Sequence, residues 1–133
     1  MTAAHAGSPL AEKLDLKRGV RAWFADLPDD VRAALGLDRL GVDEQQAPSA
    51  GLEYVHLFPA DRAMLQRQLA AVRELIEPAA FVWVSWLGQD APGELDADAI
   101  RAVAAPLGLT DVATCAVSDS WCGLKLMIRR SLA

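Results

Sequence analysis

The sequence predicts a single α/β domain in which helices alternate with the strands of a mostly parallel sheet. Residues 53–58 read as a strand, and an amphipathic helix and a second strand at 80–86 follow, which makes a strand–helix–strand unit. After a shorter helix come two β-rich runs, 109–117 and 121–129, separated by a tight turn, which predicts a closing antiparallel hairpin. This order predicts a Rossmann-like three-layer domain, with the ground plan of a truncated methyltransferase.

Short elements are expected in the first half of the chain. Pro9 can occupy the first position of a helix capped by Ser8, and Val20–Phe24 read as the first strand. A second helix begins near Pro28 and stops at Gly36, a residue type that readily takes the left-handed conformation. Beyond it, residues 37–42 predict a weak strand, and the segment up to Gly51 has no periodicity.

The helix after Phe58 has the clearest periodicity in the chain. Its apolar positions recur at spacings of four, three and four: Leu65, Leu69, Val72 and Ile76. Pro78 prevents the helix from continuing. We expect Leu69 to share a core with Val84 on the following strand.

The order of the last three strands can be predicted from their polarity. Ala80–Trp86 is apolar on both faces, as a central strand should be. A helix capped by Asp96 and ended near Gly108 follows it. Residues 121–129 are more apolar than 109–117, and edge strands tolerate polar residues better than central ones. We therefore expect 121–129 to insert antiparallel between the other two strands.

Length and charge limit the classes of function. The chain has 133 residues, enough for one domain over 9–133 after a disordered tail at 1–8. Its formal net charge is −5, from 18 acidic and 13 basic residues, so no basic field for nucleic acid is visible. Neither a membrane-spanning run nor a signal peptide is recognisable. We expect a cytoplasmic protein without nucleic-acid or membrane partners.

The loop after Phe24 is where a cofactor would be expected. Nucleotide and S-adenosylmethionine sites of this architecture need glycines there, because the backbone must approach the ligand closely. The chain has no glycine in this loop and carries Asp26, Asp29 and Asp30. Those carboxylates would repel a pyrophosphate; S-adenosylmethionine has no phosphate, but the missing glycines count against it. We therefore expect no cofactor.

The residue types needed for nucleophilic or metal chemistry are sparse. Ser85 is not in a Gly-x-Ser-x-Gly elbow, and His56 reads as a half-buried strand residue. Cys115 and Cys122 flank the hairpin turn, where a disulfide is conceivable but two buried thiols are favoured in a reducing cytosol. With two histidines and two cysteines, no metal-ligand spacing is present. No catalytic residue and no metal ligand is expected.

A small-molecule site is conceivable where the parallel strands end, because open α/β sheets bind ligands outside the carboxyl ends of their strands. The candidates are the polar and aromatic residues at those ends and in the hairpin turn: Asp61, Ser85, Trp86, Gly88 and Asp119. Two simpler readings stay open. Trp86 can cap the core, and Asp119 can bond to turn amides. Trp83, on the opposite face of its strand from Trp86, is expected in the core.

Several motifs occur in an order that resembles a known family. They are Leu10-Ala-Glu-Lys-Leu14, Val55-His-Leu-Phe58, Val82-Trp-Val-Ser-Trp86, Pro106-Leu-Gly-Leu109 and Trp121-Cys-Gly-Leu-Lys-Leu126. Over residues 9–130 the chain resembles the bacterial family called domain of unknown function 3052. The resemblance implies the same fold and compartment and supplies no catalytic residues. Glu53-Tyr54 departs from the small residue and aspartate usual before the Val-His-Leu-Phe strand.

These observations favour a non-catalytic, degenerate Rossmann-like domain that acts by protein association, with a partner or with itself, or as an accessory regulator. One alternative is a small-metabolite or S-adenosylmethionine-type binding domain or enzyme, with its site at the carboxyl ends of the strands. Another is a subunit that contributes half of a composite site.

Overall fold

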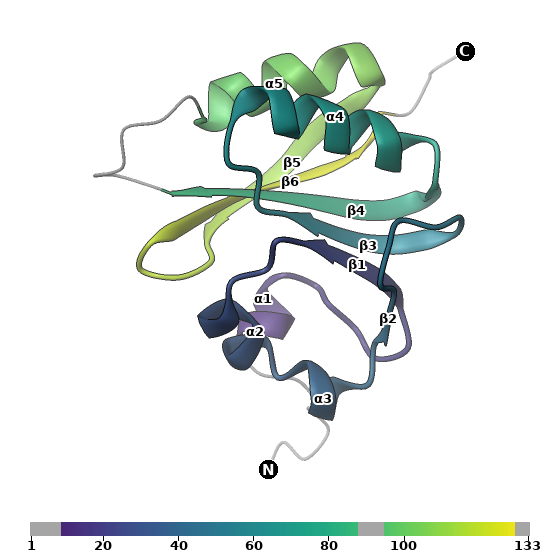
Figure 1. The fold of residues 1–133 in the computed structure, drawn as a ribbon, viewed down its shortest axis with the longest axis vertical. Helices are drawn as coiled ribbons and strands as arrows, with labels where there is room; N and C mark the ends of the chain where they lie inside the picture. The colour runs from purple at the N-terminus through teal and green to yellow at the C-terminus, as the bar shows by residue number, and fades with distance from the viewer. Residues whose placement is uncertain (1–8, 88–94, 130–133) are drawn as a thin grey trace.

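The computed structural model describes residues 9–87 and 95–129 and has three layers, a six-stranded sheet with helices on both faces (Figure 1). The helices are α1 (Pro9–Lys13), α2 (Asp29–Leu35), α3 (Leu37–Leu40), α4 (Arg62–Arg73), α5 (Ala97–Ala104) and the 3-10 helix η1 (Ala105–Leu107). The strands are β1 (Arg21–Ala25), β2 (Asp43–Glu44), β3 (Leu52–Leu57), β4 (Ile76–Leu87), β5 (Leu109–Ala116) and β6 (Trp121–Ile128). The predicted α/β Rossmann-like class is confirmed.

The sheet order is β2-β1-β3-β4-β6-β5. Strands β2, β1, β3 and β4 are parallel to one another, while β6 runs antiparallel to both β4 and β5. Val82 pairs with Leu126 and Leu87 pairs with Trp121. The predicted insertion of the last strand is therefore confirmed, and the more polar β5 forms the edge.

One face of the sheet is covered by α4 and α5 (Figure 1). Leu69 of α4 and Val84 of β4 are both fully buried in the core between these layers, as expected. Ile100 and Val103 of α5 join the same core. Burying each such side chain contributes about 1.5–3 kcal/mol, so this layer stabilises the central strands strongly.

The other face is covered by α1, α2 and α3 (Figure 1). Trp83 is 2% exposed there, and its indole N–H donates to the Leu14 carbonyl at 2.9 Å, so the prediction that it is core is confirmed. Lys125 of β6 lies over the Phe81 ring and pairs with Asp15. These contacts fasten the segment after α1 across the central strands.

The end of α4 differs from the prediction. The helix stops at Arg73, and Ile76 belongs to β4, where it pairs with Leu52 of β3. Pro78 lies inside the strand at a register shift between that pair and the next one, Tyr54 with Phe81. A proline is tolerated there because an irregular stretch needs no ladder hydrogen bond from its nitrogen.

The weak strand expected over 37–42 is wrong. Gly36 does end α2 in the left-handed conformation, as predicted, but the chain then forms α3, whose Leu37 and Leu40 are buried at helical spacing. The strand comes later, at Asp43–Glu44, inside the segment that shows no periodicity. The tail at 1–8 and its Ser8 cap lie outside the described residues.

Candidate functional site

The carboxyl ends of the parallel strands form one rim of the sheet. At this rim β1 leads into α2 and β3 leads into α4, and the two helices cover opposite faces. Such a switch point between neighbouring strands is where open α/β sheets bind ligands. The backbone N–H of Phe58 donates to the Ala25 carbonyl at 3.1 Å. The two loops are therefore joined directly at the switch point.

The β1–α2 loop turns at Asp26, whose φ of 57° lies in the left-handed region. Glycine is the usual residue for that conformation, and aspartate is among the few others that adopt it readily. The Asp26 side chain is exposed and makes no hydrogen bond or ion pair within 9–87 and 95–129. The loop therefore makes a sharp turn without glycine, and the residue at the turn, Asp26, carries a free carboxylate.

A buried polar network lies just inside the rim. His56 Nε2 is 2.7 Å from Ser85 Oγ, and His56 Nδ1 is 3.4 Å from the Tyr54 hydroxyl. His56 and Ser85 are fully buried. Burial lowers the pKa of His56 from 6.5 to about 3, so the ring is neutral at physiological pH and one nitrogen donates while the other accepts.

This network has the connectivity of a nucleophile, a base and an orienting group, but it lacks their accessibility. A substrate cannot reach Ser85 Oγ because the serine has no exposed surface. A catalytic base works best with a pKa near the working pH, and the pKa of His56 is far lower. The Ser85–His56 pair is thus a structural hydrogen bond across β3 and β4.

Aromatic rings continue the network to the rim. His56 stacks on Phe58, with ring centroids 4.4 Å apart and planes 17° apart. The rings of Phe58 and Trp121, the first residue of β6, are perpendicular, with centroids 5.1 Å apart and planes 87° apart. Because Trp121 pairs with Leu87 at the end of β4, the hairpin turn lies at the same rim. Leu87 is 47% exposed and adds apolar surface there.

The predicted site residues fall into different environments. Asp61 caps α4 and accepts from the Met64 N–H at 2.8 Å. Trp86 packs against the core beneath α4 and α5, which agrees with the interpretation that it caps the core. Asp119 is exposed in the turn, where Ser118 Oγ accepts from the Ser120 and Trp121 amides.

Ser85, expected to line a pocket, instead points into the core, because its side chain lies on the face of β4 that carries Trp83. Gly88 lies outside the described residues. The structure therefore leaves Asp61 and Asp119 exposed at the rim, and it adds Asp26, Phe58 and Trp121, which are not among the five candidates. The sequence carries one signal for this rim: His56 is a polar residue within the apolar strand Val55-His-Leu-Phe58.

A second polar group lies between α2 and the end of β2. Arg32 donates to both carboxylate oxygens of Glu44, at 3.0 and 2.7 Å. Glu44 comes about 20 residues after β1, where dinucleotide folds place an acid that binds the ribose. Here the Glu44 carboxylate is instead hydrogen-bonded to Arg32 of the same protein. This hydrogen-bonded pair also raises the pKa of Arg32.

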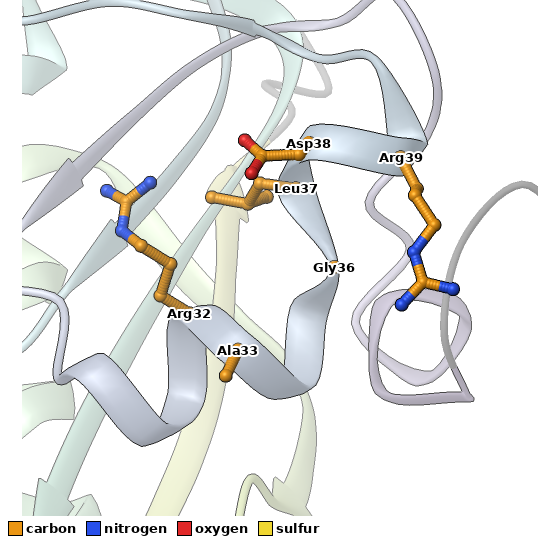
Figure 2. A pocket seen from close by; sticks show the side chains of 6 residues that line it. All are labelled: Arg32, Ala33, Gly36, Leu37, Asp38 and Arg39. Carbon is orange, nitrogen blue, oxygen red and sulfur yellow. The ribbon is translucent and has the colours of Figure 1, made fainter.

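Arg32 also lines a cavity of about 220 Å³ beside the turn between α2 and α3. Figure 2 shows the Asp38 carboxylate on the same side of Gly36 as Arg32, whereas Arg39 extends the other way. Because opposite charges line it and most of its lining residues are exposed side chains of two short helices, the cavity indicates no particular ligand.

The cysteines are not placed for a disulfide. Cys115 pairs with Gly123, while Cys122 pairs with Ala116. Directly paired residues share a face and successive residues alternate, so the two thiols point to opposite faces of the hairpin. The conceivable disulfide is therefore not formed, and the favoured thiols are only partly buried. Both cysteines are free and partly exposed. No group of three potential metal-ligating side chains occurs within the described ranges, and no helix in them is long and apolar enough to cross a membrane.

Comparison with known proteins finds similar structures without close sequence relatives. No protein-family model and no curated protein matches the sequence. A protein from Sulfolobus solfataricus described as a type 11 methyltransferase matches with a TM-score of 0.68 and 11% identity, over 94% of this chain and 92% of that one. A SAM-dependent methyltransferase from Aquifex aeolicus matches with a TM-score of 0.56 and 11% identity, over 96% and 94%.

Magnesium protoporphyrin IX methyltransferase from Synechocystis, solved with bound SAM, matches with a TM-score of 0.58 and 9% identity, over 91% of this chain and 74% of that one. At such identities the likeness establishes the fold. It also corrects the preferred functional interpretation, because the fold neighbours favour a site of the S-adenosylmethionine type over a non-catalytic domain that acts by association.

Proposed function

We propose that this chain binds a small molecule of the S-adenosylmethionine type at the rim where β1 and β3 end. Bound there, such a ligand supplies a methyl group on a positively charged sulfur. The observation that carries the proposal is the left-handed turn at Asp26, which presents a free carboxylate at the switch point of a methyltransferase-like sheet.

The charge of the rim supports this ligand class over a dinucleotide. The described connections at the rim, with the first turns of α2 and α4, carry five carboxylates and one guanidinium, Arg62: Asp26, Asp29, Asp30, Asp61 and Asp119. One ammonium, that of Lys13, reaches the Ala116 carbonyl at the end of β5, so the carboxylates remain in excess. An acidic field attracts the sulfonium and ammonium groups of S-adenosylmethionine and repels a pyrophosphate. The loop without glycine fits a ligand that lies beside the Asp26 carboxylate rather than one cradled by backbone amides.

Aromatic surface at the same rim supports a nucleoside component. Phe58 and Trp121 form an edge-to-face pair beside the Ala25–Asp26 turn. Such rings offer apolar area for a flat base, and Trp121 is partly exposed. Asp26 would hold the positive end of the ligand, and Trp121 would contact its base.

Calorimetric titration with S-adenosylmethionine, S-adenosylhomocysteine and NAD tests the proposal. We expect a dissociation constant below about 100 μM, or about −5.5 kcal/mol, for the first two ligands and no measurable binding of NAD. Asp26→Asn preserves the size and the left-handed preference of the residue while removing its charge. It should weaken S-adenosylmethionine more than S-adenosylhomocysteine, because the latter has a neutral thioether.

Glu77→Gln is the matched control, since it removes one exposed carboxylate at the amino end of β4. It should leave both affinities unchanged. Absence of binding by both adenosyl ligands at about 1 mM, a concentration that detects about −4 kcal/mol, would contradict the proposal. Equal weakening of the two ligands by Asp26→Asn would place the sulfonium elsewhere.

A further inference from the structure

A line of side chains connects the interior of the sheet to the rim. Tyr54, His56 and Phe58 occupy alternate positions of β3 and its end and therefore lie on one face. The rings of His56 and Phe58 are stacked at 4.4 Å, and Phe58 meets Trp121 at 5.1 Å. Phe58 is only 4% exposed, so its ring is held by these neighbours rather than by solvent.

His56 is the member of this line that is fixed from outside its own strand. Its Nε2 is 2.7 Å from Ser85 Oγ on β4, a short bond that sets the plane of the imidazole. The contact with the Tyr54 hydroxyl is longer, at 3.4 Å. Ser85 therefore determines the orientation of the ring on which Phe58 stacks.

Phe58 in turn joins the parts of the rim. Its N–H donates to the Ala25 carbonyl, one residue before the turn at Asp26, and its ring contacts the start of β6. A change in the His56 plane would therefore be transmitted through one residue to the β1–α2 loop and to the hairpin.

We infer that His56, oriented by Ser85, is a positioning residue that holds Phe58 and so maintains the placement of the Asp26 turn relative to Trp121. The inference deepens the proposed function and rests on it where ligand affinity is concerned. The hydrogen bond and the ring stack can be tested without any ligand.

Two variants separate the effect of the Ser85–His56 hydrogen bond from that of the imidazole ring stacked on Phe58. Ser85→Ala removes the hydrogen bond and leaves the imidazole, whereas His56→Gln removes the ring and leaves a polar side chain on the same face of the sheet as Ser85. Tyr54→Phe is the matched control, because it deletes only the hydroxyl at 3.4 Å. If Ser85 acts through His56, the double variant should be no worse than the more severe single one.

Amide hydrogen exchange, followed by NMR, gives the readout that a purely structural role would not move. Global destabilisation raises exchange by a common factor at core amides that open only by global unfolding. Positioning predicts that, in Ser85→Ala and in His56→Gln, exchange of the Phe58 amide rises about tenfold more than that of the Leu69 amide in α4. Tyr54→Phe should change this ratio less than about twofold. An equal rise at Phe58 and Leu69 would overturn the inference.

Affinity for S-adenosylhomocysteine is measured on the same variants. We expect it to fall about tenfold in both Ser85→Ala and His56→Gln, or about 1.4 kcal/mol. If the wild-type chain binds no adenosyl ligand, the proposed function fails, while the exchange ratio still decides whether His56 positions Phe58. If the ligand binds and its affinity is unchanged in both variants, the proposed site does not depend on His56 and the inference is wrong.

Discussion

Replacing His56 with glutamine should remove a specific part of the acid sensitivity of this fold. The imidazole is completely buried, and burial lowers its pKa from 6.5 to about 3. In the unfolded chain the same ring takes up a proton below about pH 6.5. Between these values the unfolded state binds more protons than the native state, so stability must fall as pH falls.

The magnitude follows from the size of the shift. Each pH unit below 6.5 costs about 1.4 kcal/mol, until the native ring titrates near pH 3. Lowering the pH from 7.5 to 5 should therefore reduce the free energy of unfolding by about 2 kcal/mol through His56 alone. Most carboxylates remain ionised over this interval, which makes it the best window for isolating the histidine.

Urea denaturation at pH 7.5, 6.5, 5.8 and 5.0 (roughly half-unit to unit steps across the titration of the unfolded ring) measures the effect. The quantity of interest is the difference in pH dependence between the wild type and His56→Gln, because contributions common to both cancel. We expect the variant to lose about 2 kcal/mol less than the wild type over the interval. Tyr54→Phe, which keeps the imidazole, should follow the wild type. Parallel losses in the wild type and His56→Gln would refute the argument, since the native ring would then titrate as in water.

Three further substitutions test the packing by urea denaturation. Leu69→Ala should cost about 2–5 kcal/mol, because the side chain is fully buried between α4 and the sheet; a loss below about 1 kcal/mol would make this layer peripheral. Gly123→Ala should cost about 1–3 kcal/mol, since a Cβ there would stand 2.9 Å from Val117 Cγ2 and 3.3 Å from the Trp83 ring; an unchanged urea midpoint would mean that the hairpin shifts to accommodate the methyl group. Asp61→Ala should cost about 1 kcal/mol through the lost cap of α4, whereas a loss of adenosyl-ligand affinity at unchanged stability would assign Asp61 to the site instead.

The features set by local chemistry could be predicted from the sequence. Gly36 ends α2 and Asp96 caps α5 because those side chains, or their absence, act on the backbone within a few residues. The inner place of β6 also followed from composition, since the apolar strand gains most from being covered on both edges. Such signals depend on residues close in sequence or on the polarity of one segment, so they can be recognised in the sequence.

The site depended on contacts that no local pattern encodes. Pro78 reads as a stop for the helix, but the pairing of Ile76 with Leu52 places it within an irregular part of β4. Ser85 reads as a rim residue, yet it bonds to His56, which lies 29 residues away in sequence on the neighbouring strand and pairs with Trp83, two residues before Ser85. Parallel pairing of β3 and β4 sets this distance, and a one-residue change of register would turn one of the two side chains to the other face.

The sequence alone determined the fold class, the order of the last strands and the absence of glycine after β1. Only the tertiary structure decided that the β1–α2 loop nevertheless makes a left-handed turn at Asp26, and that Phe58 connects this loop to β3 and to the hairpin. The physical reason is that helix caps and strand polarity are properties of short segments. The shape of a rim instead arises from register, which is settled only when the whole sheet is packed.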